Sequence, residues 1–247
     1  MQTAVLSHPA DTLDLIADCG CTAAIFDLDG VVTRTTHLHV RAWQRALDEF
    51  LRQAAPAAAL FDPNVDYPRH LDGRTRMEGL RQFLASRDID LPAGQDDDAR
   101  FISLAGLGTY KNSLYLQALE TSGIDTYADA IAFVERLRRR SYPIALATSS
   151  KNAPLILART GLGDLFDLVI DGNVTERLGL RSKPAPDIFI HAADQLGRPL
   201  RECAVFEDTV AVLDGLAGLA PGCAVAVVRD GRRYAGGNFH IIEGFHG

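Results

Sequence analysis

Short apolar runs recur along the chain, each bounded by acidic, hydroxyl or turn residues. The runs cover residues 23–26, 144–147, 168–170, 203–206 and 224–228. Runs this short and continuous are typical of strands buried on both faces of a parallel sheet. Apolar residues at helical spacing separate several of the runs, before residue 144 and after Lys151 and Asp208. The alternation predicts an α/β fold with a doubly wound parallel sheet.

A long insertion interrupts this pattern, because more than a hundred residues separate the first run from the second. One crossover helix needs far fewer. Apolar residues fall on one helix face around Trp43, around Leu80 and from Leu114 to Ala118. We therefore predict an inserted α-helical cap domain over residues 34–122, with residues 1–33 and 123–247 forming the α/β core.

Composition narrows the functional classes. The 247 residues are 47% hydrophobic and 23% charged, which is typical of a globular chain of one or two domains. A net charge of −7 without a basic patch argues against nucleic acid as a partner. The sequence also lacks a membrane-length apolar run and a secretory signal pattern. We expect a cytoplasmic protein, a monomer or weak homodimer, that acts on a small molecule.

Lysine is rare in this chain: of 25 basic side chains, only three are Lys, at positions 111, 151 and 183. An ammonium is a compact point charge that a guanidinium does not replace, so each position raises the question of its task. Lys183 lies on a loop stiffened by Pro184 and Pro186. Lys111 belongs to no motif, and we expect it on the surface.

The four cysteines are Cys19, Cys21, Cys203 and Cys223, too few for a disulfide scaffold. The Cys-Gly-Cys segment has no Cys or His close by in the sequence to complete a metal site. We expect reduced thiols with a structural role. The histidines other than His39, including His240, belong to no comparable pattern.

Residues capable of chemistry follow the predicted strands. The segments are Asp27-Leu28-Asp29-Gly30, Thr148-Ser149-Ser150 with Lys151-Asn152, the loop at Lys183, and Glu207-Asp208. Parallel strands present their carboxyl ends at one edge of a sheet, where ligands bind. Singly, each segment has a plain structural explanation, such as an acidic turn or a helix N-cap. Together, their order and strand context favour one shared site.

These four segments resemble the motifs of the haloacid dehalogenase-like superfamily. The resemblance implies a Rossmann-like core with a helical cap between the first and second motifs. Within the superfamily, the chain is similar to the β-phosphoglucomutase-like phosphatases and phosphohexomutases. The residues that support this are Thr35, His39, Arg41, Trp43, the Gly73–Arg76 segment, Ser150 to Asn152, and Lys183 to Phe189.

The resemblance implies Mg²⁺-dependent phosphoryl transfer on a small sugar phosphate through an aspartyl phosphate. Asp27 would be the nucleophile and Asp29 the general acid and base. Thr148 would bind phosphate oxygens, and Lys183 would neutralise the transferring group. The Mg²⁺ ligands would be the Asp27 carboxylate, the Asp29 backbone carbonyl and Asp208, with Glu207 as a ligand or immediately behind the ligands.

Further residues would contact the substrate. Arg76 matches a family arginine that holds a distal phosphate, and Thr35 and His39 match residues of a hinge and substrate gate. Ser149, Ser150, Lys151 and Asn152 would bind phosphate or substrate. Two alternatives stay open: His39 as a helix histidine with a satisfied hydrogen bond, and Lys151 as a solvated residue.

The chain departs from the family pattern at Arg34, Asp72, Val212 and Ala128-Asp129, and in its tail from Arg229 onward. Asp72 replaces a lysine that influences mutase specificity, which weakens the case for β-glucose 1-phosphate. The core motifs are common to phosphatases and mutases, so they do not separate the two. The alternative outside enzymology is a catalytically weak sugar-phosphate-binding sensor or interaction protein.

Overall fold

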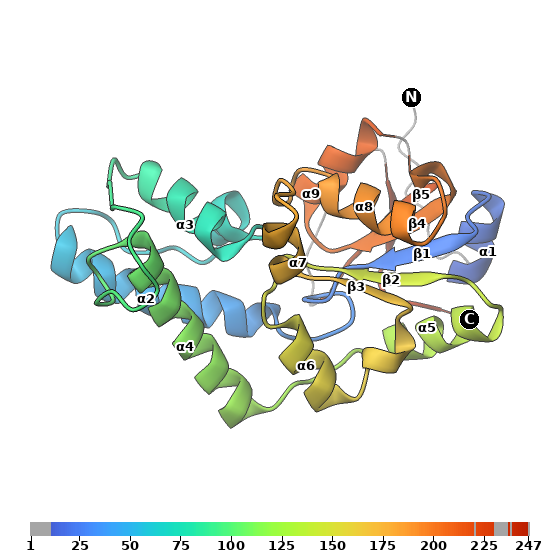
Figure 1. The fold of residues 1–247 in the computed structure, drawn as a ribbon, viewed down its shortest axis with the longest axis horizontal. Coiled ribbons are helices and arrows are strands. Elements are labelled where there is room, and N and C mark those ends of the chain that lie inside the picture. Colours follow the sequence, from blue (N-terminus) through green and yellow to red (C-terminus); the bar gives the residue numbers. More distant parts are fainter. Residues whose placement is uncertain (1–10, 220, 230–236, 238, 247) are drawn as a thin grey trace. The chain divides into compact units, whose positions relative to one another are not determined.

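The computed structural model describes residues 11–219, 221–229, 237 and 239–246. The chain forms two compact units (Figure 1). The core unit comprises the described residues up to Arg34 and from Asp125 onward. The helical unit comprises Thr35–Ile124.

The core unit contains a six-stranded sheet in the order β3-β2-β1-β4-β5-β6, and every neighbouring pair is parallel. The strands are β1 (Ala23–Phe26), β2 (Ile144–Ala147), β3 (Leu168–Ile170), β4 (Cys203–Glu207), β5 (Cys223–Val227) and β6 (His240–Ile242). The predicted α/β fold is confirmed. The strand β6 lies in the tail, where no strand was predicted. Strand order reverses between β1 and β4, which makes their carboxyl ends the expected place for a ligand.

Helices cover both faces of this sheet (Figure 1). They are α1 (Thr12–Asp18), α5 (Ala128–Arg139), α6 (Ala153–Thr160), α7 (Gly172–Arg177), α8 (Asp187–Gln195) and α9 (Val210–Ala217), with 3₁₀ turns at Gly163–Leu165 and Leu200–Glu202. Helix α8 packs on β1, β2 and β3, and α9 packs on β4 and β5. Helix α5 lies on the opposite face (Figure 1).

Alternation along the strands explains how both faces are filled. Ile25 and Val205 pack in a cluster with Phe189 of α8. The next residues, Phe26 and Phe206, point the other way, and their rings stack with centroids 4.6 Å apart. These side chains are buried on both faces of the sheet, so successive positions in these strands have to be apolar, which explains the continuous apolar runs.

The helical unit contains α2 (Thr36–Ala54), a π-helical turn (Tyr67–Leu71), α3 (Arg76–Ala85) and α4 (Leu104–Ser122). Helices α2 and α4 pack against each other, and the apolar stripe around Leu47 and Phe50 is buried. Ser103 caps α4 by accepting a hydrogen bond from the N–H of Gly106. Among the described residues, no helix is long and apolar enough to cross a membrane.

Asp129 anchors the tail to the start of α5. Its Oδ2 accepts hydrogen bonds from Arg229 Nη1 (2.8 Å) and from the Phe245 N–H (2.9 Å). Burial opposes ionisation, but these donors outweigh it and lower the pKa of Asp129 below its ordinary value of 3.8. Asp129 and the tail are both departures from the family pattern, and in this structure they are in contact with each other.

We expect Asp129→Asn to destabilise the chain by about 1 kcal/mol at pH 7, because a charged acceptor of two hydrogen bonds is lost at a partly exposed site. A lowered folded-state pKa stabilises the chain above the unfolded value, so the difference should begin to shrink as pH falls below 3.8 and disappear only below the folded-state pKa. Urea unfolding at pH 7 and at a series of pH values below 3.8 measures this. The exposed Asp164→Asn is the control, and an equal loss in both variants would contradict the assignment.

Candidate active site

Three carboxylates meet at the carboxyl ends of β1 and β4. Asp27 follows β1 directly, Glu207 ends β4, and Asp208 is the next residue. All three are buried, and each has a carboxylate oxygen within 4.8 Å of the others. The Asp27 N–H donates to the Phe206 carbonyl (2.9 Å), so strand pairing itself aligns the two strand ends. The structure thus brings together the acidic residues of the first and last motifs.

Lys183 reaches this cluster from the loop before α8. Its Nζ donates to Asp27 Oδ1 at 2.6 Å and to Glu207 Oε1 at 2.7 Å. The side chain is 1% exposed and lies 4.8 Å from the centre of the Phe189 ring. Helix α9 makes room for the loop at Gly215, because a Cβ there would lie 2.3 Å from the Pro184 carbonyl oxygen.

Glu207 uses both carboxylate oxygens within the protein. While Oε1 accepts from Lys183, Oε2 accepts from the N–H groups of Asp208 (2.7 Å) and Thr209 (3.1 Å). The Thr209 hydroxyl in turn donates to Asp208 Oδ1 (3.3 Å). Glu207 therefore holds both the Lys183 ammonium and the turn after β4 in place.

The cluster is electrostatically unbalanced. Burial raises the pKa of Asp27, Lys183 opposes this, and the Glu207 and Asp29 carboxylates raise it further, to about 8. Burial alone would lower the pKa of Lys183, but Asp27 and Glu207 outweigh it and raise that pKa. One ammonium therefore faces a surplus of buried carboxylates. Oxygen donors with excess negative charge are the set that a hard divalent cation prefers.

The loop after β1 presents Asp29 two residues beyond Asp27. Gly30 adopts φ +93°, a conformation that L side chains rarely take, and its N–H donates to the Thr33 carbonyl at 2.8 Å. The Leu28 carbonyl accepts from the N–H groups of Val32 and Thr33. The glycine in the motif is thus required by the tight loop that holds the half-buried Asp29.

The loop after β2 contains two successive hydroxyl turns. Thr148 is buried, and its Oγ1 accepts from the Ser150 N–H at 3.1 Å. The Ser150 hydroxyl accepts from the Asn152 N–H at 3.2 Å. Gly172 allows close packing against this loop, because a Cβ there would lie 2.5 Å from the Ser149 carbonyl oxygen. The segment is a compact series of hydroxyl and N–H groups.

Lys151 lies beside this loop in an ion pair with Glu176, at 2.8 Å. The two side chains are 36% and 69% exposed, respectively. Exposed pairs of this kind contribute little to stability. Of the two interpretations of Lys151, substrate contact or solvated residue, this geometry favours the solvated residue.

The prediction that Lys111 is a surface residue is wrong, because the side chain is 3% exposed. Its Nζ lies 2.8 Å from Nδ1 of His39 and 4.9 Å from the ring centres of Trp43 and Tyr115. An ammonium can only donate, which makes Nδ1 the acceptor and places the imidazole hydrogen on Nε2. His39 also stacks on Tyr115, with centroids 3.8 Å apart. A signal existed: Lys111 shares a helix face with Leu107, Leu114 and Tyr115.

Two arginines lie at the start of α3: Arg74 just before the helix and Arg76 as its first residue. Arg76 Nη1 donates to the Gly108 carbonyl at 3.4 Å. Arg74 was not singled out from the sequence, yet its Nε and Nη1 are buried and make no hydrogen bond to any residue that the structure describes. Burial lowers the pKa of Arg74, which Glu78 and Asp72 only partly oppose. Thr35 is fully buried at the start of α2.

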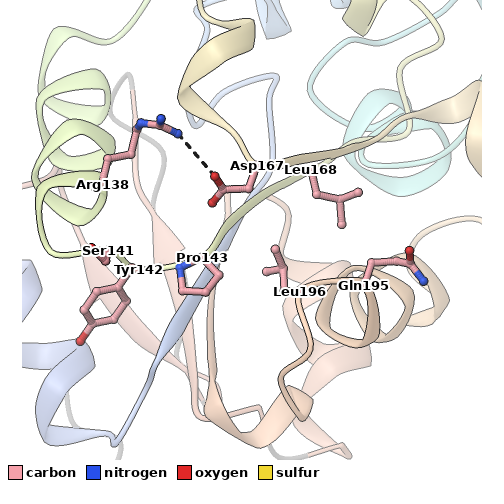
Figure 2. Close-up of a pocket in the computed structure, with 8 residues that line it drawn as sticks. All are labelled: Arg138, Ser141, Tyr142, Pro143, Asp167, Leu168, Gln195 and Leu196. Carbon is pink, nitrogen blue, oxygen red and sulfur yellow. Dashed lines mark ion pairs between the residues drawn. The ribbon is translucent and has the colours of Figure 1, made fainter.

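A cavity of about 500 Å³ in the core unit is lined by none of the candidate site residues (Figure 2). Its lining includes Pro143 and Asp167, which immediately precede β2 and β3, and Leu196 after α8. Arg138 and Asp167 form an ion pair at its wall, 3.6 Å apart. The cavity therefore opens at the amino ends of the strands, the opposite edge from the carboxylate cluster.

We expect Lys183→Met to destabilise the metal-free chain by about 3–5 kcal/mol at pH 8, because two buried carboxylates lose their ammonium. The loss should shrink at pH 5.5. A carboxylate with a raised folded-state pKa takes up a proton on folding, so stability falls as pH rises from 3.8 towards 8.

Urea unfolding in chelator at both pH values measures this effect. Lys151→Met is the matched control and should change stability by less than about 0.5 kcal/mol. A Lys183→Met loss that is the same at both pH values would count against a carboxylate origin.

Comparison with known proteins identifies a family for this chain. A family model described as haloacid dehalogenase-like hydrolase matches residues 21–219. The β-phosphoglucomutases of Mycobacterium bovis and Mycobacterium tuberculosis are each 34% identical over 229 residues, covering 91% of this chain and 80% of theirs. Hexitol phosphatase A of Escherichia coli is 30% identical over 208 residues, covering 84% of this chain and 83% of its own.

A solved structure is also similar. The β-phosphoglucomutase of Clostridium difficile superposes with a TM-score of 0.69 at 25% identity, over 84% of this chain and 85% of that one. The chain belongs to the β-phosphoglucomutase-like family of the haloacid dehalogenase-like hydrolases.

Proposed function

We propose that this protein transfers phosphoryl groups from small sugar phosphates through an aspartyl phosphate on Asp27. The observation that carries the proposal is the buried contact of Lys183 with Asp27 and Glu207, beside Asp208. A buried carboxylate held by an ammonium suits attack on phosphorus, since catalysis of phosphoryl transfer is mostly positioning and charge stabilisation.

The residues present fit a Mg²⁺ ion. The carboxylates of Asp27 and Asp208 and the backbone carbonyl of Asp29 would hold it, with Glu207 positioned behind them by its own hydrogen bonds. Bound there, the ion would offset the negative charge of the phosphoryl group and of the nucleophile. The excess of carboxylates over ammonium groups in the cluster is the observation that supports this fit.

In the first half-reaction, an Asp27 carboxylate oxygen attacks phosphorus and the bond from phosphorus to the sugar oxygen breaks. Asp29 gives its proton to the departing oxygen, which leaves as a hydroxyl group. Lys183 holds the attacking carboxylate in place through its 2.6 Å contact. Thr148 and the N–H groups of the following loop bind the phosphoryl oxygens.

In the second half-reaction, Asp29 takes a proton from the acceptor hydroxyl, which attacks the aspartyl phosphate. The bond between phosphorus and the Asp27 oxygen breaks, and the free carboxylate returns. Water as acceptor gives a phosphatase, and a sugar hydroxyl gives a mutase. The residues of the core unit serve both outcomes, so the choice depends on which acceptor is held.

We assign recognition of the remote part of the substrate to the helical unit. Arg74 and Arg76 provide guanidinium groups suited to a second anionic group. His39, held by Lys111 and Tyr115, has its hydrogen on Nε2 and can donate to a hydroxyl or phosphate oxygen. Asp72 adds a negative charge two residues from Arg74, which favours a substrate other than β-glucose 1-phosphate.

We expect Asp27→Asn to lower turnover by more than about 10³-fold, because the amide is a poor nucleophile. Asp29→Asn should lower it by about 10²–10⁴-fold through loss of proton transfer. The assay is release or transfer of phosphate with Mg²⁺, and the exposed Asp194→Asn serves as a control that keeps full activity. Normal turnover by Asp27→Asn would rule out the nucleophile.

The substrate panel consists of hexose phosphates, including glucose 1-phosphate with and without a hexose bisphosphate. Free phosphate indicates a phosphatase, and glucose 6-phosphate formed without free phosphate indicates a mutase. Tight binding of a sugar phosphate with no turnover of any ester would replace the proposal with the sensor function.

We expect Arg74→Gln to raise KM for the best substrate by about 10-fold or more, with a smaller change in kcat. The reason is that a hydrogen bond from a charged donor contributes about 1.5–3 kcal/mol to binding. Arg69→Gln, which removes an exposed arginine from the neighbouring turn, should leave KM unchanged. Equal KM values for the two folded variants would remove Arg74 from the substrate site.

A further inference from the structure

The amino ends of the strands collect sulfur and nitrogen donors that the phosphoryl-transfer proposal does not use. Cys203 begins β4, Cys223 begins β5 and His240 begins β6, while Cys19 follows α1 shortly before β1. Parallel pairing places these strand starts at one edge of the sheet. Residues separated by up to 221 positions are therefore neighbours, which the spacing in the sequence could not indicate.

Three of these side chains converge. The Sγ atoms of Cys19 and Cys223 and a ring nitrogen of His240 all lie within 4.8 Å of one another. The distance from Cys19 Sγ to His240 Nε2 is 3.8 Å. Ligands of a tetrahedral Zn²⁺, with bonds of about 2.3 Å to sulfur and 2.0 Å to nitrogen, stand roughly 3.6 Å apart. Small side-chain adjustments would bring these three atoms to metal-binding distance.

The imidazole gives a second, independent indication. Nδ1 of His240 is buried and has no hydrogen-bond partner among the residues that the structure describes. No described residue therefore fixes the ring through Nδ1, while Nε2 faces the Cys19 thiol.

The surroundings suit a small ion. Cys19 and His240 are partly exposed, which leaves a route from solvent, whereas Cys223 is buried. Cys21 packs close by, since a Cβ on Gly222, next to Cys223, would lie 2.8 Å from its Sγ. Two thiols and an imidazole form a soft donor set, which selects Zn²⁺ over the oxygen-preferring Mg²⁺.

We propose that Cys19, Cys223 and His240 form a Zn²⁺-binding site at the amino edge of the sheet, with a fourth position for water or another ligand. The site joins the end of α1 to the starts of β5 and β6. A bound ion would therefore connect the first helix to the tail strand and stabilise the core unit, because it binds the folded chain and not the dispersed donors.

The test uses the full chain, reduced and stripped of metal, in millimolar Mg²⁺ so that the carboxylate cluster is occupied. Titration with Co²⁺ should produce the near-ultraviolet charge-transfer band of cobalt thiolate at one equivalent per chain. Added Zn²⁺ should abolish that band. Zn²⁺ affinity is then measured by competition with a chelating dye, and Zn²⁺ should also raise Tm.

The variants Cys19→Ser and His240→Gln should each weaken Zn²⁺ binding by more than about 100-fold, since losing even an outer-shell partner costs 10–100-fold. Cys203→Ser is the matched control. Its thiol donates to the Pro199 carbonyl at 3.5 Å, a hydrogen bond that serine retains. This variant should bind Zn²⁺ as the unaltered chain does.

Three results would overturn the proposal. The first is the absence of a cobalt thiolate band at saturation. The second is equal affinity in Cys19→Ser, His240→Gln and the control. The third is a Cys19–Cys223 disulfide that forms in air while the reduced chain binds no Zn²⁺, which would make the cysteines a redox pair.

Discussion

The buried ammonium of Lys183 is the constraint on which the core unit depends. A cation that is 1% exposed is stable there only because Asp27 and Glu207 both contact it. Those two carboxylates come from strands separated by most of the chain, and they are neighbours because β1 pairs with β4. Gly215 completes the arrangement by letting the lysine loop approach α9. Strand order, loop packing and charge balance thus converge on one nitrogen atom.

The two edges of the sheet carry donors of different chemical character. At the carboxyl edge, Asp27, Glu207 and Asp208 supply hard oxygen atoms. At the amino edge, Cys19, Cys223 and His240 supply sulfur and nitrogen. A single strand shows the contrast: β4 begins with the thiol of Cys203 and ends with the carboxylate of Glu207. Because each strand in a parallel sheet has the same direction, this segregation follows directly from where each residue stands in its strand.

Local patterns predicted most of the fold and the centre of the candidate site. The strand runs, the inserted helices and the four motif segments are each contained in a few consecutive residues, so their chemistry is visible without long-range contacts. Lys111 shows where this fails. Its burial depends on His39, 72 positions away on another helix, and on rings that can cover an ammonium. The apolar neighbours on its own helix face could have indicated the burial, but a charged residue is mostly exposed by default.

His240 shows a different limit. The strand β6 is three residues long and lies in an atypical tail, so periodicity carries little information there. The contact between His240 and Cys19 forms only when the whole sheet is assembled. Arg74 lies in the Gly73–Arg76 segment, but for a similar reason it was not singled out, since burial of its Nε and Nη1 depends on tertiary packing. Contacts between distant segments are what the one-dimensional pattern does not contain.

The scarcity of lysine has a practical consequence. Lys183 and Lys111 are buried in different units, and Lys151 alone of the three side chains is substantially exposed. An amine-reactive reagent should therefore acylate one lysine side chain of the folded protein and three of the unfolded protein. Acylation at Lys183 reports opening of the core unit, and acylation at Lys111 reports opening of the helical unit. The two units can thus be followed separately by mass spectrometry without introducing a label.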